Sequence, residues 1–202
     1  MFKRFLRFAF SHFCENKILY FVSVGASVFG ILLGAAGGKN FSDGAYLTAF
    51  FGGLSDVSKS ALLLRAFGSA LLISSLAAIF GLSPIGFAAL PVIDAYRGFA
   101  FGFSASAFYS VYGLKSMVFI LLALVIPALL WLPILIFTSV NSIRSSLSML
   151  KICRRRTSPE FSSDAKFMLI SCAVMFIFML ISRLAEIYIV PPILNVVSGL
   201  YM

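Results

Sequence analysis

The chain has 202 residues, of which 61% are hydrophobic and 11% are charged. A soluble domain carries about 25% charged residues, so this sequence has too few polar residues to build a water-exposed surface. The net charge of +9 does not indicate a nucleic-acid partner, because no aromatic-and-basic binding surface accompanies it. The composition predicts an all-α integral membrane protein, with residues 1–202 forming one polytopic domain surrounded by membrane lipid.

The basic residues gather in two short segments. Four of them precede the first apolar run and six lie between residues 141 and 166 (Lys3, Arg4, Arg7, Lys17; Arg144, Lys151, Arg154, Arg155, Arg156, Lys166). Short loops rich in Lys and Arg face the cytoplasm. Both segments are therefore expected on the cytoplasmic side, and an even number of membrane crossings must separate them.

Residues 2–16 place apolar and basic side chains at helical spacing. This pattern predicts a short amphipathic helix on the membrane surface, although a merely basic N-terminal segment fits equally well. The first long apolar run, residues 18–36, is predicted to span the membrane. A cleaved signal peptide is the alternative, but the run is longer than a usual signal core.

Four further apolar stretches complete a predicted bundle of about five transmembrane helices. They cover residues 61–80, 85–111, 117–140 and 167–190, each of a length that suits a hydrocarbon core about 30 Å thick. The stretch 85–111 contains charges, yet it must cross if both basic segments are cytoplasmic. Pro191-Pro192 is predicted to end the last helix, which leaves the C-terminus outside the cell.

Residues 39–60 form a predicted outer loop with an apolar centre. This pattern suggests a short helix that lies at the membrane–water interface. Its apolar residues Phe50, Phe51 and Leu54 are candidates for a partner-binding surface.

Catalytic and metal-binding patterns are not found in the sequence. His12 is the single histidine, so a histidine-pair zinc site cannot form, and His12 is expected to be a polar-face residue of the N-terminal segment. Neither a nucleophile elbow nor a phosphate-binding glycine loop occurs. The three cysteines do not indicate a disulfide framework. No catalytic residue, cofactor or metal is expected.

Small residues recur at four-residue spacing in two of the predicted spans. One set is Ala26, Gly30, Gly34 and Gly38, and the other is Gly98, Gly102 and Ser106. Stripes of small residues let helix backbones approach closely in lipid, where no hydrophobic drive brings helices together. We expect both stripes to pack against neighbouring helices.

Charged residues inside predicted spans form two pairs at i,i+3 spacing. Asp94 and Arg97 lie in the middle of 85–111, and Arg183 and Glu186 lie nearer the outer end of 167–190. An isolated charge at the bilayer centre costs about 2.5–3.5 kcal/mol, and pairing lowers that cost. Asp94 and Arg97 are expected to clamp the third span against its neighbours or to serve a function. Arg183 and Glu186 are expected to form an interfacial salt bridge.

The order of these segments resembles the stage II sporulation protein M family. The resemblance rests on Gly81-Leu82-Ser83-Pro84-Ile85-Gly86, on Arg97-Gly98-Phe99-Ala100-Phe101-Gly102-Phe103, and on a basic start with His12 before a first span that ends in glycines. It covers nearly the whole chain. The chain departs from the family at Ala89-Leu90-Pro91, because the family's proline lies closer to the preceding turn.

The resemblance implies a non-enzymatic scaffold in the cell membrane that localises peptidoglycan-degrading enzymes during engulfment in endospore formation. Its implied partners are stage II sporulation proteins D and P. Two alternatives stay open. One is a small transporter or permease subunit with a midplane site around Asp94 and Arg97. The other is a relative with the same fold in a cell that does not form spores.

Overall fold

The computed structural model describes residues 12–39, 59–113, 117, 120–154 and 161–201. This part of the chain is all helical. Its elements are α2 (Lys17–Lys39), α4 (Lys59–Gly81), α5 (Gly86–Tyr112), the π-helix η2 (Ile120–Val125), α7 (Ile126–Cys153) and α8 (Phe161–Tyr201). The predicted N-terminal helix at 2–16 falls largely outside the described residues.

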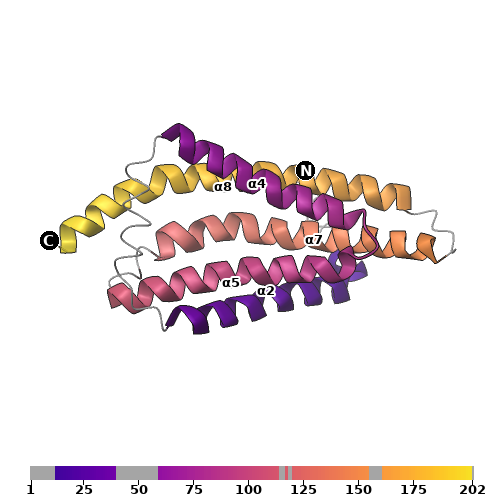
Figure 1. The fold of residues 1–202 in the computed structure, drawn as a ribbon, viewed down its shortest axis with the longest axis horizontal. Helices are drawn as coiled ribbons and strands as arrows, with labels where there is room; N and C mark the ends of the chain where they lie inside the picture. The colour runs from indigo at the N-terminus through magenta and orange to yellow at the C-terminus, as the bar shows by residue number, and fades with distance from the viewer. Residues whose placement is uncertain (1–11, 40–58, 114–116, 118–119, 155–160, 202) are drawn as a thin grey trace.

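The long helices run side by side in an elongated bundle (Figure 1). Helix α2 packs along α5, α4 packs along α8, and α7 lies between these pairs and contacts all four. The start of α2, the α4–α5 turn and the α7–α8 connection lie at one end of the bundle (Figure 1). The described parts of both basic segments therefore share one end, which we call the basic end.

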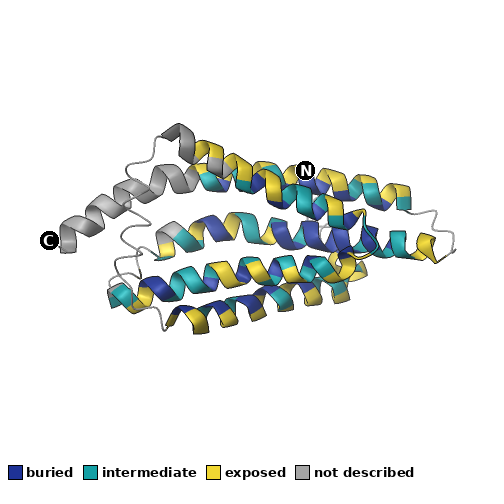
Figure 2. Ribbon diagram, in the orientation of Figure 1, coloured by how far each residue is buried: buried dark blue, intermediate teal, exposed yellow. Residues whose placement is uncertain are grey.

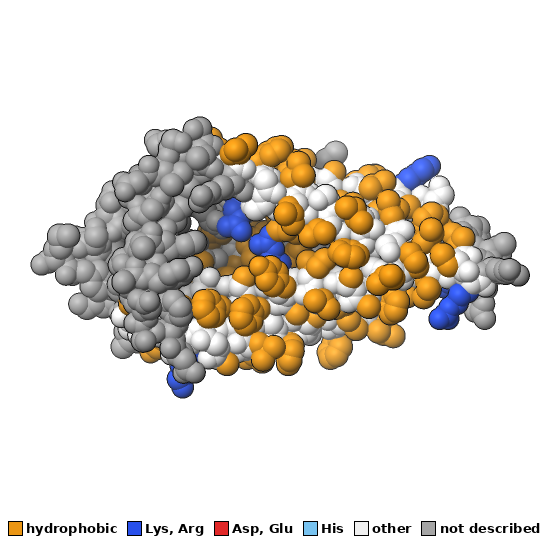
Figure 3. Space-filling view, in the orientation of Figure 1, with side chains coloured by type: hydrophobic (Ala, Val, Ile, Leu, Met, Phe, Trp, Pro, Cys, Tyr) orange, Lys and Arg blue, Asp and Glu red, His pale blue; other side chains and the backbone are white. Residues whose placement is uncertain are grey.

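Burial in this bundle is the reverse of burial in a soluble protein. Large apolar side chains are exposed along every long helix, with Phe21 82% and Ile18 79% exposed. In contrast, Asp94, Ser23 and Ser142 are fully buried. Figure 2 shows buried strips facing the bundle interior, and Figure 3 shows many apolar side chains on the coloured part of the visible face. Such a molecule suits lipid, because lipid solvates apolar side chains and leaves polar ones to pair inside.

Within the described residues, three helices are long and apolar enough to cross a membrane. They are Lys17–Lys39, Ile126–Cys153 and Phe161–Leu184, and Phe67–Gly81 of α4 is a shorter apolar helix. Helix α5, 27 residues long, is not among the three. The fold is thus an all-helical membrane protein with three candidate spans.

Two helices extend beyond their predicted ends. Helix α7 continues to Cys153, whereas the sequence pattern predicted an end at Val140, because serines and Asn141 read as a polar loop. The prediction that Pro191-Pro192 ends the last helix is wrong, since α8 continues to Tyr201. Proline's fixed φ of about −65° is itself helical, and membrane helices tolerate the lost donors better than soluble ones.

The π-helix lies directly before Pro127. Pro127 occupies the first turn of α7, and Pro133 lies inside that helix. A proline cannot donate to the carbonyl four residues earlier, so the preceding turn gains no α-helical bond at that position. The wider turns of η2 are consistent with this local loss of a donor.

Candidate functional site

The carboxyl group of Asp94 joins three helices. Asp94 lies on α5 and is fully buried. Its Oδ2 accepts a hydrogen bond from the hydroxyl of Ser23 on α2, and its Oδ1 accepts one from the hydroxyl of Ser139 on α7 at 2.6 Å. Because both donors come from other helices, one side chain fixes α2, α5 and α7 relative to each other.

Arg97, one turn further along α5, lies beside a different neighbour. Its guanidinium carbon lies 5.8 Å from the ring centre of Trp131 on α7, a geometry that allows a cation–π interaction. Both carboxyl oxygens of Asp94 are taken by serines rather than by Arg97. The two charges of α5 thus hold neighbouring helices instead of each other.

Glycines bring α2 and α5 into backbone contact. A Cβ at Gly30, Gly34 or Gly98 would lie 2.0–2.2 Å from a carbonyl oxygen of the opposite helix, so only hydrogen fits there. Gly38 and Gly102 meet the facing backbone in the same way. The buried face of α2 is made by Ser23, Ser27, Gly30, Gly34 and Gly38. Ala26, which was predicted in this stripe, is only half-buried, and Ser27 takes its place.

Two hydroxyl groups of α5 strengthen this contact near the C-terminal ends of α2 and α5. The hydroxyl of Ser106 donates to the carbonyl oxygen of Ala35 at 2.8 Å, and that of Ser110 donates to the carbonyl oxygen of Lys39 at 3.1 Å. Hydroxyl-to-carbonyl bonds between helices are a common device where lipid surrounds the bundle. The α2–α5 pair is therefore held along its whole length.

Helix α7 carries a buried polar stripe that sequence reasoning missed. Ser146 binds the α4–α5 turn twice: its hydroxyl donates to the carbonyl oxygen of Ser83 at 2.7 Å and accepts from the backbone N–H of Phe87 at 2.8 Å. Asn141 donates to the Ser171 hydroxyl of α8 at 2.9 Å. The helical spacing of 138, 142, 145 and 146 was the signal that could have revealed this stripe.

The sequence suggested that His12 lies on a polar face of the N-terminal segment, but the structure shows that it is buried. It is 7% exposed, and its Nδ1 lies 3.1 Å from the hydroxyl of Tyr20. Its ring also contacts Phe137 of α7 and Phe167 of α8. Burial lowers the pKa of His12 below its usual 6.5, and a hydrogen bond with Asn141 opposes this effect.

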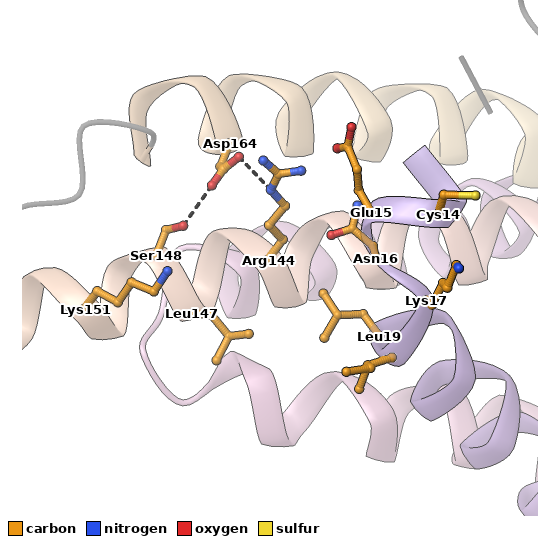
Figure 4. Close-up of a pocket in the computed structure, with 11 residues that line it drawn as sticks. Cys14, Glu15, Asn16, Lys17, Leu19, Arg144, Leu147, Ser148, Lys151 and Asp164 are labelled. Atoms are coloured by element: carbon orange, nitrogen blue, oxygen red, sulfur yellow. Dashed lines mark hydrogen bonds and ion pairs between the residues drawn. The ribbon is translucent and has the colours of Figure 1, made fainter. Parts of the chain in front are cut away.

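A pocket of about 540 Å³ opens at the basic end. It lies where the start of α2 meets the last turns of α7 and the first turn of α8, as Figure 4 shows. On its α8 side, Asp164 accepts a hydrogen bond from the Ser148 hydroxyl at 2.8 Å and forms an ion pair with Arg144 at 3.0 Å. Lys17 and Lys151 also line it.

Several predicted residues fall elsewhere. Phe50, Phe51 and Leu54 lie outside the described residues, and so does the side chain of Glu186. Arg183 is half-buried on α8. In the described part of the chain, no three His, Cys, Asp or Glu side chains come together to hold a metal ion.

Comparison with known proteins assigns the family. No curated protein and no solved structure matches the chain significantly. The family model for stage II sporulation protein M matches residues 18–191. This range includes nearly all of α2, the glycines that bring α2 and α5 together, Asp94, the serines of α7 and most of α8. This protein belongs to the stage II sporulation protein M family and is a sporulation-related membrane protein.

Proposed function

We propose that this protein is a non-enzymatic scaffold that anchors and localises peptidoglycan-degrading enzymes in the cell membrane during engulfment. The observation that carries the proposal is the family match over residues 18–191. The implied partners are stage II sporulation proteins D and P. The scaffold needs no cofactor, because its task is to hold enzymes at one place in the membrane.

The proposed topology has five crossings, a cytoplasmic N-terminus and an extracytoplasmic C-terminus. The shared end of the described parts of the two basic segments supports it, because such segments stay on the cytoplasmic side. Helix α5 has 27 residues, and at 1.5 Å per residue its length of about 40 Å suits a tilted crossing. The segments 39–60 and 193–202 would then face the cell wall, where the enzymes act.

The topology is tested with a reporter fused after Met202. A phosphatase that folds only outside the cytoplasm should be active in this fusion, and a fluorescent protein that matures only in the cytoplasm should be dark. The same reporters fused after Arg154, at the basic end, should give the opposite result. A cytoplasmic Met202 would remove the topology on which wall-side anchoring depends.

The anchoring role is tested by co-purification. The tagged full-length chain is co-expressed with stage II sporulation proteins D and P, solubilised in mild detergent and recovered. Replacing Phe50, Phe51 and Leu54 with serine should reduce partner recovery several-fold. A matched control carries Ser42→Ala and Asp56→Asn in the same loop. Equal recovery of partners by both variants would argue against this surface.

The transporter alternative has less support from the described residues. Asp94 is fully buried, both its oxygens accept serine hydroxyls, and it does not line the pocket at the basic end. A midplane transport site needs polar groups that face an opening. A ligand-induced rise in the unfolding temperature that disappears in Asp94→Asn would favour transport over scaffolding.

A further inference from the structure

The pocket at the basic end differs from the polar interior because it combines charge with apolar surface. Its wall includes Ile18, Leu19 and Leu147 beside the charged residues. Figure 4 shows Lys151 and Lys17 at opposite ends of the pocket, with Leu147 and Leu19 between them on the side away from α8. A small soluble anion has no use for that apolar wall.

The charges of the pocket leave the two lysines available. Arg144 is neutralised by Asp164 at 3.0 Å. Glu15 and Arg144 both extend towards α8, as Figure 4 shows. Lys17 and Lys151 are exposed, and neither ammonium group has an ion pair or hydrogen bond within the described residues. With three basic and two acidic side chains in its wall, the pocket carries a net positive charge.

The pocket also lies where the apolar outer surface of the bundle begins. Ile18, directly after Lys17, is 79% exposed, and Phe21 one turn later is 82% exposed. On α8, the exposed apolar residues Leu169 and Ile170 follow Lys166 in the same way. A level where basic side chains give way to exposed apolar ones is the level of lipid headgroups.

We propose that this pocket binds the headgroup of an anionic phospholipid. The headgroup lies in the pocket, which Lys17 and Lys151 flank at opposite ends, and an acyl chain follows the apolar surface that starts at Ile18 and Leu19. Basic pockets between membrane helices bind anionic headgroups by this combination of charge and apolar contact. Bound lipid would join the start of α2 to the end of α7, two segments that are far apart in the sequence.

Purified full-length protein in detergent is titrated with dioleoyl phosphatidylglycerol or with dioleoyl phosphatidylcholine, and bound lipid is counted by native mass spectrometry. We expect phosphatidylglycerol to be retained in preference to phosphatidylcholine. Each lysine near an anionic lipid surface is worth about fivefold in affinity. Lys17→Gln with Lys151→Gln should therefore weaken phosphatidylglycerol binding roughly thirtyfold.

The control exchanges two lysines outside the pocket, Lys39→Gln at the other end of α2 and Lys166→Gln on α8. It makes the same change in net charge and should leave binding unchanged, and Lys17→Arg with Lys151→Arg should retain it. Equal retention of the two lipids, or equal loss in the pocket and control variants, would overturn the proposal. Competition by inorganic phosphate or glycerol phosphate at the same concentrations would assign the pocket to a soluble anion and overturn it too.

Discussion

Gly34→Ala tests whether the backbone contact between α2 and α5 holds the bundle together. A Cβ at this position would lie 2.2 Å from the carbonyl oxygen of Phe99 and 2.7 Å from the backbone nitrogen of Phe103. Both are backbone atoms, so no side-chain rotation makes room, and the two helices must separate locally by about 1 Å. Such a gap removes roughly a quarter to a half of the van der Waals attraction there, and overpacking of this kind costs about 1–3 kcal/mol.

The matched control is Gly25→Ala on the same helix. A Cβ at Gly25 meets nothing within 4 Å, so this variant should be neutral or slightly more stable, because alanine favours the helix. Gly98→Ala on the facing helix, whose Cβ would lie 2.2 Å from the carbonyl oxygen of Ser27, should behave like Gly34→Ala.

The assay is thermal unfolding of the purified proteins in one detergent, followed by circular dichroism. For a chain of this size, a loss of about 2 kcal/mol lowers the midpoint by roughly 4–8 °C. Equal midpoints for Gly34→Ala and Gly25→Ala would refute the close backbone contact.

Three further variants probe the polar interior in the same unfolding assay. Ser146→Ala removes two hydrogen bonds to the α4–α5 turn and should cost about 1–3 kcal/mol, whereas Ser74→Ala, whose hydroxyl bonds its own helix, should be near neutral. Asp94→Asn replaces one acceptor oxygen by a donor and should lose one serine bond, about 1 kcal/mol; an unchanged midpoint would contradict the three-helix junction. Burial lowers the pKa of His12 below 6.5, so the unfolded chain takes up its proton at a higher pH than the folded chain does. The contribution of neutral His12 to the free energy of unfolding should be fully present above pH 6.5 and be lost as the pH falls from 6.5 through the lowered pKa. His12→Asn should reduce this dependence of the free energy of unfolding on pH.

Composition and charge placement predicted the main features of the fold because lipid imposes simple demands on a sequence. Apolar runs longer than 18 residues predicted helices, and α2, α4, α5, α7 and α8 cover all five of the predicted stretches in whole or in large part. The described parts of the two basic segments lie at one end of the bundle. The small residues of α2 and α5 were visible as stripes, because the spacing of four residues is set by helix geometry alone.

The partners of those stripes could not be predicted. Nothing in the spacing of Gly34 indicates that it meets Phe99 rather than another helix. One member of the predicted α2 stripe was also wrong, since Ser27 rather than Ala26 lies on the buried face with Gly30, Gly34 and Gly38. Small hydroxyl residues also allow close packing and can bond to a neighbouring helix. Ser106 was recognised in the α5 stripe, whereas Ser23 and Ser27 of α2 were not.

The polar stripe of α7 was missed for a different physical reason. The rule that apolar residues are buried placed Asn141, Ser142 and Ser145 in a polar gap outside the predicted spans. In lipid the rule is reversed for the bundle interior, because polar groups avoid hydrocarbon by facing one another. The same rule misplaced His12. The imidazole of His12 contacts Tyr20 of α2 and Phe167 of α8, and only the fold brings these two helices together around it.

Helix α5 shows how these features combine in the proposed topology. It does not reach the hydropathy of the three apolar helices, and alone it would bear about 2.5–3.5 kcal/mol for each of its two charges at the bilayer centre. Its neighbours offset that cost, since Ser23 and Ser139 bind Asp94, and Trp131 lies against Arg97. All three partners lie on helices that are themselves apolar enough to insert. The proposed crossing by α5 therefore depends on α2 and α7 being in place. Substitution of both Ser23 and Ser139 should reduce the inserted fraction of α5 more than that of α2.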